Sequence, residues 1–148
     1  MLMKARLIVR TPNPRPAKRS QPERGVQRQI VMLLRHVGCQ VWVLGTTRPS
    51  GDFMGTCQTP GTPDLICWLP RQLGVMFIEV KAPKGRLSPE QKRFRECAEA
   101  VQGQLGSGVH YVSGGVDAVT ARLVALGLIR AEQVPHYYLA QQQMEERT

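Results

Sequence analysis

The chain has 148 residues, a length that suits one compact domain with short extensions. Hydrophobic residues make up 42% of it, which excludes a wholly disordered protein. No apolar run approaches the roughly 18 residues that a membrane span requires, so we expect no membrane segment. The basic N-terminal stretch has only a few consecutive apolar residues, and we expect no secretory signal.

The four cysteines form neither a CxxC pair nor a Cys/His cluster with zinc-finger spacing. Cys39, Cys67 and Cys97 stand among apolar residues and are interpreted as small core side chains, and Cys57 is also taken as structural. Unpaired thiols of this kind are typical of a reducing compartment, so we expect a cytoplasmic protein.

The positive charge is concentrated at the front of the chain. Twenty Lys and Arg residues against 11 Asp and Glu give a net charge of +9. Residues 1–35 contain nine of the basic residues and a single acid, Glu23. A cationic arm of this kind attracts polyanions, and binding releases their counterions. Nucleic acid is therefore the expected partner, while a merely solubilising basic tail stays open.

The predicted elements follow an α-β-β-β-α-β-α order after a basic, proline-rich arm at 1–19. A capping-box pattern at 20–23 starts a helix that ends near Gly38, and a second such pattern, Ser88-Pro89-Glu90-Gln91, starts another that ends near 103. Strands are predicted at 39–46, 64–70, 74–82 and 109–113, a third helix at 116–127, and a tail at 129–148. The long Gly- and Pro-rich stretch at 45–63 is predicted to be a functional loop.

This order predicts an α/β fold with a mixed sheet. Strands one to three can form an antiparallel meander, whereas the fourth returns through a helix and should pair in parallel. Trp42 and Trp68 lie on predicted strands and are expected to belong to the core.

Three charged residues interrupt the two apolar strands in the middle of the chain. Glu79 and Lys81 are two apart and share one strand face, and a hairpin turning at 71–73 brings Asp64 beside them. Two neighbouring carboxylates repel unless a cation lies between them. Mg²⁺ uses one or two carboxylates and keeps waters, and a lysine can assist the attacking water. The pattern therefore suits metal-assisted hydrolysis of a phosphodiester.

Two further polar residues lie on the inward faces of the predicted helices. Glu23 and Gln91 can point toward the carboxylates, but each is also the reciprocal residue of its own capping box. Lys84 and Arg86, on the turn after the Glu79 strand, are interpreted either as phosphate contacts or as residues of a solvated turn. The same two interpretations apply to Arg48 in the long loop.

The Pro63-Asp64 and Glu79-Val80-Lys81 pattern resembles the PD-(D/E)XK nuclease superfamily. With the helical Glu23, the strings GTPDLI, FIEVKAPKGRLSPEQ and VHYVSGGVDAV resemble its VRR-NUC branch, over about 23–119 of the chain. Such domains resemble Holliday junction resolvases in fold, which implies a restriction-endonuclease-like core over residues 20–128.

The resemblance implies a role for each matching residue. Asp64, Glu79 and the Val80 carbonyl would bind Mg²⁺, for which Mn²⁺ substitutes, with Glu23 as an additional metal or site acid. Lys81 would be the catalytic lysine, and Gln91 would support the site. The basic residues that we expect to bind nucleic acid are Lys84, Arg86, Arg48, Lys18, Arg19 and Arg24.

The resemblance implies a Mg²⁺-dependent endodeoxyribonuclease that acts on branched DNA such as Holliday junctions, as a homodimer. Small nucleases of this kind are often phage-borne, so the expected setting is a bacterial or phage-infected cell. Two alternatives stay open. One is a sequence-specific, flap-directed or RNA-directed nuclease of the same fold, and the other is a non-catalytic nucleic-acid-binding protein.

Overall fold

The computed structural model describes residues 21–44, 59–104 and 106–134. The arm, the 45–58 part of the long loop and residues 135–148 lie outside the described residues, as do the expectations for Lys18, Arg19, Ser20, Arg48 and Cys57. In chain order the elements are α1 (Gln21–His36), β1 (Gln40–Val43), β2 (Leu65–Leu69), β3 (Gly74–Val80), α2 (Pro89–Gln102), β4 (Val109–Gly114), α3 (Val116–Ala125) and the 3-10 helix η1 (Ala131–Gln133).

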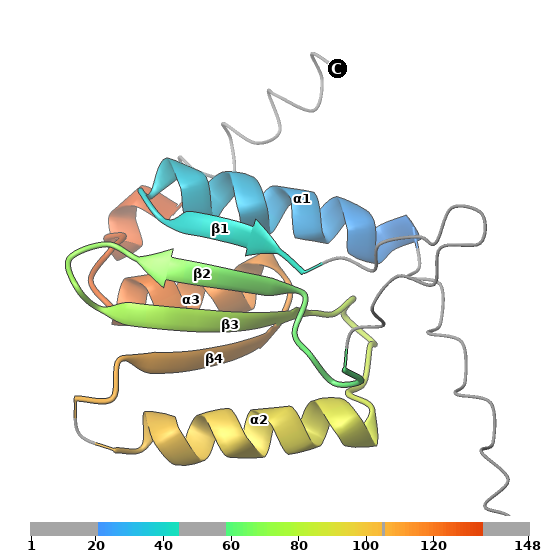
Figure 1. Ribbon diagram of the computed structural model, residues 1–148. Helices are drawn as coiled ribbons and strands as arrows, with labels where there is room; N and C mark the ends of the chain where they lie inside the picture. The colour runs from blue at the N-terminus through green and yellow to red at the C-terminus, as the bar shows by residue number, and fades with distance from the viewer. Residues whose placement is uncertain (1–20, 45–58, 105, 135–148) are drawn as a thin grey trace, which may run out of the picture.

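The four strands form one mixed sheet in the order β1-β2-β3-β4 (Figure 1). The β1–β2 and β2–β3 pairs are antiparallel, and β4 is parallel to β3. A parallel neighbour needs a crossover, which α2 provides. The expected α/β fold class, with an α-β-β-β-α-β core and helices on a mixed sheet, is confirmed.

A two-residue turn sets the register of the central hairpin. Arg71 and Gln72 have φ values of 57° and 58°, the left-handed conformation that matches the twist of the flanking strands. Arg71 also donates a hydrogen bond from Nη1 to the carbonyl of Gly127, at 3.4 Å. With this turn, Leu65 pairs with Ile78, so Asp64 lies across from Glu79 in the next row.

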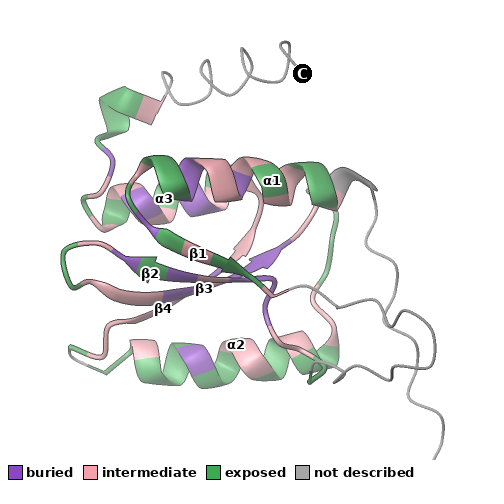
Figure 2. Ribbon diagram, turned by 45° about the horizontal axis from the view of Figure 1, so that its top comes forward, coloured by how far each residue is buried: buried purple, intermediate pink, exposed green. Residues whose placement is uncertain are grey.

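The apolar core lies between the sheet and the pair α1 and α3, which cover one face, whereas α2 lies on the other (Figures 1 and 2). Alternate residues of the central strands point into this core because successive side chains face opposite ways. Its buried members include Ile30 and Leu34 from α1, Leu65, Cys67, Met76, Ile78 and Val80 from the sheet, and Val119 and Leu123 from α3.

The α2 face is packed less completely. Phe94 of α2 contacts Phe77 of β3 and Tyr111 of β4, with ring centroids 5.2 and 6.1 Å apart. The prediction that Trp42 and Trp68 belong to the core is wrong, since each is 53% exposed. Both lie on β1 and β2, which this packing leaves open, so their strand pattern did not guarantee burial.

The cysteine predictions are partly confirmed. Cys39 and Cys67 are buried, but Cys97 is exposed on α2, so its assignment to the core is wrong. Its neighbour in sequence, Ala98, takes the buried position on that helix.

The core extends past residue 128, the expected end of the domain. Ile129 is 2% exposed and belongs to the core cluster, and η1 follows it. Among the described helices, none has both the length and the apolar character needed to cross a membrane.

Candidate active site

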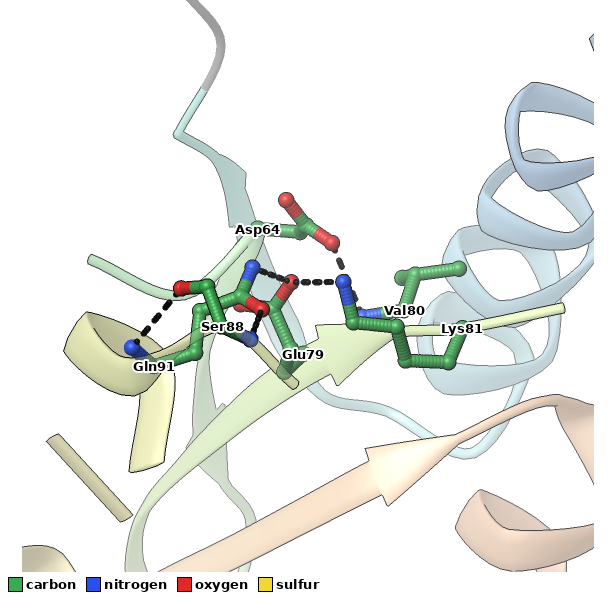
Figure 3. Close-up of polar contacts among 6 residues, drawn as sticks. All are labelled: Asp64, Glu79, Val80, Lys81, Ser88 and Gln91. Carbon is green, nitrogen blue, oxygen red and sulfur yellow. Dashed lines mark hydrogen bonds and ion pairs between the residues drawn. The ribbon is translucent and has the colours of Figure 1, made fainter. Parts of the chain in front are cut away.

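Asp64 and Glu79 are brought together by neighbouring strands. Asp64 directly precedes β2, and Glu79 is the last residue but one of β3. Both are buried, with relative exposures of 5% and 2%. Figure 3 shows their carboxylates at the same end of the sheet, near Lys81 and Gln91. Acids are rarely buried without partners, so the arrangement is typical of a functional site.

The backbone around Asp64 fixes its carboxylate. Its Oδ2 atom accepts a hydrogen bond of 2.8 Å from the backbone N–H of Val80 (Figure 3), and its own carbonyl accepts one of 2.8 Å from Leu44. The preceding turn is closed by Thr62, whose hydroxyl donates to the carbonyl of Thr59 at 2.7 Å. Asp64 is therefore held on both sides, by β3 and by the end of β1.

Gly61 places this turn against the first turn of α2. Its φ is +91°, and a Cβ added there would lie 2.5 Å from the carbonyl oxygen of Glu90. Only glycine allows both the left-handed backbone and this close approach. The Gly-Thr-Pro sequence before Asp64 thus joins the start of β2 to the helix that carries Gln91.

Lys81 supplies a cation next to Glu79. Its Nζ atom lies 3.3 Å from Oε1 of Glu79, and its side chain is 16% exposed (Figure 3). Its backbone N–H donates to the carbonyl of Gly114 on β4, at 2.9 Å. The lysine therefore starts from a fixed position at the end of β3 and points its ammonium toward the carboxylates.

Gln91 both caps α2 and contacts Glu79. Its Oε1 atom accepts from the backbone N–H of Ser88 at 2.8 Å, while its backbone N–H donates to the Ser88 hydroxyl at 3.2 Å. Its Nε2 atom donates to Oε1 of Glu79 at 2.6 Å (Figure 3). An amide has separate acceptor and donor atoms, so the two roles that the sequence left as alternatives coexist.

Glu23 lies in the first turn of α1 and is partly buried. One turn later, Val26 approaches the backbone beside the site, since a Cβ added to Gly115 would lie 3.8 Å from both Val26 Cγ1 and the Lys81 carbonyl oxygen. In the part of the chain that the structure describes, Glu23 has no hydrogen bond or ion pair to the other site residues. Its role in the site stays a prediction.

The donor atoms fit a hard divalent cation. Asp64 and Glu79 offer carboxylate oxygens, and the Val80 carbonyl is a further oxygen donor at the same strand end. The residues that the structure describes contain no cluster of three or more His, Cys, Asp or Glu side chains suited to a metal. Two carboxylates suffice for Mg²⁺, which keeps several waters, so the set fits Mg²⁺ better than a softer metal.

Tyr111 is a buried neighbour of the site that the sequence did not single out. It is 4% exposed, and burial, followed by the charge of Glu79, raises its pKa to about 12. The phenol therefore stays neutral at physiological pH, next to the tilted ring of Phe94. The only signal in the sequence was an aromatic residue on the fourth predicted strand.

Of the predicted nucleic-acid contacts, three lie in the described residues. Lys84 and Arg86 are exposed on the turn between β3 and α2, where Gly85 donates to the carbonyl of Ala82 at 2.8 Å. Arg24 is exposed on the first turn of α1. Their positions leave all three side chains accessible, and contact with a phosphate stays a prediction.

Comparison with known proteins places this constellation in a family. Residues 52–103 match the family model of the VRR-NUC domain, a segment that includes Asp64, Glu79, Lys81 and Gln91. This segment is similar to a VRR-NUC domain. A solved structure described as "VRR_NUC domain" is 25% identical in sequence, with a TM-score of 0.49, and the similarity covers 72% of this chain and 97% of the other. No curated protein matches the chain.

The VRR-NUC domain implies a nuclease-type function, and hence binding of nucleic acid. The family match ends before β4 and α3 and begins after α1, so it includes the two carboxylates, the lysine and the turn with Lys84 and Arg86 but not Glu23.

Proposed function

We propose that this VRR-NUC domain is a metal-dependent endonuclease that hydrolyses DNA phosphodiester bonds. The observation that supports it best is the pair of buried carboxylates, Asp64 and Glu79, beside the ammonium of Lys81. A protein that only binds nucleic acid has no reason to hold two acids next to a phosphate. The non-catalytic alternative is therefore the weaker one.

Each residue has a distinct task in this chemistry. Mg²⁺, bound through Asp64, Glu79 and the Val80 carbonyl, would supply Lewis acidity and a more acidic water. Gln91 holds the Glu79 carboxylate, and the backbone N–H of Val80 holds that of Asp64. The ammonium of Lys81 orients the attacking water and offsets the charge that develops on the phosphate oxygens.

The proposed substrate is branched DNA, and the proposed working form is a homodimer. A four-way junction is two-fold symmetric, and an isologous dimer would present two active sites to it with matching symmetry. Lys84 and Arg86 lie on the turn that leaves the site strand, where they can contact phosphates on either side of the cut. Flap, sequence-specific and RNA substrates are the alternatives.

Cleavage assays decide between these substrates. Labelled four-way junction, flap, linear duplex and RNA are incubated with Mg²⁺ or Mn²⁺ and the wild type, or the variants Asp64→Ala, Glu79→Ala and Lys81→Ala. We expect cleavage of the junction by the wild type and a loss of at least about a hundredfold in each variant. Glu96→Ala, an exposed acid on α2, is the matched control and should cut normally.

The outcomes separate the parts of the proposal. If the wild type binds but cuts none of the substrates, it is not a nuclease of this kind. If it binds and cuts duplex as well as junction, the branched selectivity is wrong. Sedimentation of the free protein tests the dimer, and a monomer at assay concentrations would contradict it.

The basic arm is proposed to add non-specific affinity. Residues 1–19 carry Lys4, Arg6, Arg10, Arg15, Lys18 and Arg19. Each phosphate that they neutralise releases about one counterion, so the slope of log affinity against log salt concentration should become steeper by about one. Deletion of 1–19 should therefore weaken binding and flatten that dependence, and an unchanged slope would show that the arm does not touch DNA.

A further inference from the structure

Trp42 and Trp68 form an aromatic surface on the open half of the α2 face. Trp42 pairs with Ile66, and Trp68 lies two residues further along β2, so the two indoles are diagonal neighbours on one sheet face. Each is 53% exposed. In Figure 2, α2 lies on the side of the sheet opposite α1 and α3, and the exposed residues of β1 and β2 are green. We call Trp42, Ile66 and Trp68 the tryptophan face.

The tryptophan face is continuous with the site. Asp64, Ile66 and Trp68 alternate along one strand and share a face, because Ile66 pairs with Phe77 and Asp64 lies across from Glu79. At ~3.3 Å per residue, the Ile66 row, which includes Trp42, is about 7 Å from Asp64, and Trp68 is about 13 Å away. At the ~3.4 Å rise of a stacked strand these distances span about two and four nucleotides, and an extended unpaired strand spans them with fewer.

Charge and chemistry favour nucleic acid over a second copy of the chain as the occupant. The chain carries +9 overall, so a polynucleotide is attracted to the protein as a whole, and the uncharged tryptophan face adds a contact that suits its bases. A tryptophan offers a flat π surface on which any base can stack. Bases inside a duplex are already stacked on each other, so only unpaired bases can use it.

We propose that the tryptophan face stacks unpaired bases of the substrate strand, within about four nucleotides of the phosphate at Asp64. The inference rests on the proposed function, since it places that phosphate at the carboxylates. On this inference, the tryptophan face recognises an open or frayed strand next to the cut and not a continuous duplex.

The experiment measures binding without divalent metal, so that no cleavage occurs. The full chain in EDTA is titrated with a labelled oligothymidine strand and with a blunt duplex of the same length. Both tryptophans of the chain lie on this face, so tryptophan emission, excited where tyrosine does not absorb, reports on it alone. We expect the single strand to quench this emission, and Trp42→Ala and Trp68→Ala each to weaken single-strand binding about tenfold, with duplex affinity unchanged.

Conservative and matched variants complete the test. Trp42→Phe and Trp68→Phe keep a ring and should stay within about threefold of the wild type. Val43→Ala is the control, because Val43 is 48% exposed beside Trp42 but points to the other face of β1. Thermal melts check that every variant is folded.

Three results would overturn the inference. One is unchanged single-strand binding in the folded alanine variants, and another is an equal loss for single strand and duplex. The third is a wild-type dimer that the alanine variants convert to monomer, which would mean that a second copy covers the face. Failure of the nuclease proposal would appear separately, as no cleavage by the wild type with Mg²⁺.

Discussion

The two faces of the sheet differ in composition and in what they contribute to the molecule. The face toward α1 and α3 is apolar and sealed, with Leu65, Met76 and Ile78 fully buried. The face toward α2 carries two buried acids at one end and two exposed tryptophans beyond them. The first face accounts for stability, and the second carries groups that cost stability and that we attribute to the proposed metal and nucleic acid. Adjacent residues of one strand thus contribute to different properties, one to the stability of the core and the next to the candidate site.

The sharpest test of this division uses Asp64 and Leu65, which are neighbours in sequence on opposite faces. Leu65→Ala removes a fully buried side chain and should lower the free energy of unfolding by about 2–5 kcal/mol. Asp64→Asn should abolish cleavage but leave the free energy of unfolding, measured without metal, within about 1 kcal/mol of the wild type or above it.

Chemical denaturation and cleavage of the same preparations provide both readouts. The division fails if Asp64→Asn unfolds as easily as Leu65→Ala. It also fails if Leu65→Ala, assayed at a temperature where it is folded, has lost cleavage to the same extent as Asp64→Asn.

A pair of glycines tests the contact between the Asp64 turn and α2. Gly61 and Gly38 have almost equal φ values, +91° and +92°, but a Cβ would meet the Glu90 backbone at Gly61 and nothing within 4 Å at Gly38. Gly38→Ala should lose about 1–2 kcal/mol of stability from backbone strain, and Gly61→Ala should lose more, because the Glu90 backbone must also move. Only Gly61→Ala should also reduce the cleavage rate, by about tenfold or more, since it displaces the helix that carries Gln91. Equal rates in the two folded variants would show that the turn does not need this close approach.

The double role of Gln91 can be separated by two substitutions. Ser88→Ala removes the hydroxyl of the cap and should cost about 1 kcal/mol of stability with a small loss of cleavage. Gln91→Glu keeps an acceptor for the Ser88 N–H but sets a carboxylate against Glu79, so it should keep the helix and lose cleavage by about tenfold or more. Circular dichroism and initial rates measure the two effects. Normal cleavage by the Gln91→Glu variant would show that Gln91 only caps the helix and has no role in the site.

The smallest effect concerns the thiols. In a Cys57→Ser background, Cys97 should react with a thiol reagent within minutes, whereas Cys39 and Cys67 should react only on unfolding. The hydrogen bond with Cys39, together with burial, raises the pKa of Cys67, which keeps it protonated and unreactive at neutral pH. Rapid reaction of all three thiols in the folded protein would contradict the packing of the sealed face.

The sequence predicts the sealed face well and the open face poorly. Hydrophobic alternation and capping patterns predict the element order, and the hairpin turn predicts that Asp64 comes beside Glu79. The exposure of Trp42 and Trp68 could not be predicted, because it depends on how far α2 covers the sheet, and strand alternation does not report that. Cys97 misled for a different reason, since Ala98, its neighbour on α2, takes the inward position, and adjacent helix residues do not share a face. The contact of Gln91 with Glu79 was open until side-chain distances showed that one amide serves both partners.

The bond from Gln91 to Glu79 has a consequence for local stability. The side-chain amide of Gln91 orients the Glu79 carboxylate and also closes the first turn of α2. Helix ends open more readily than core strands. Fraying of that one turn would release Glu79 while the sheet and the core stay intact. Amide hydrogen exchange at Gln91 and Lys92 therefore reports the fraction of molecules with an assembled site, a population that global melting does not detect.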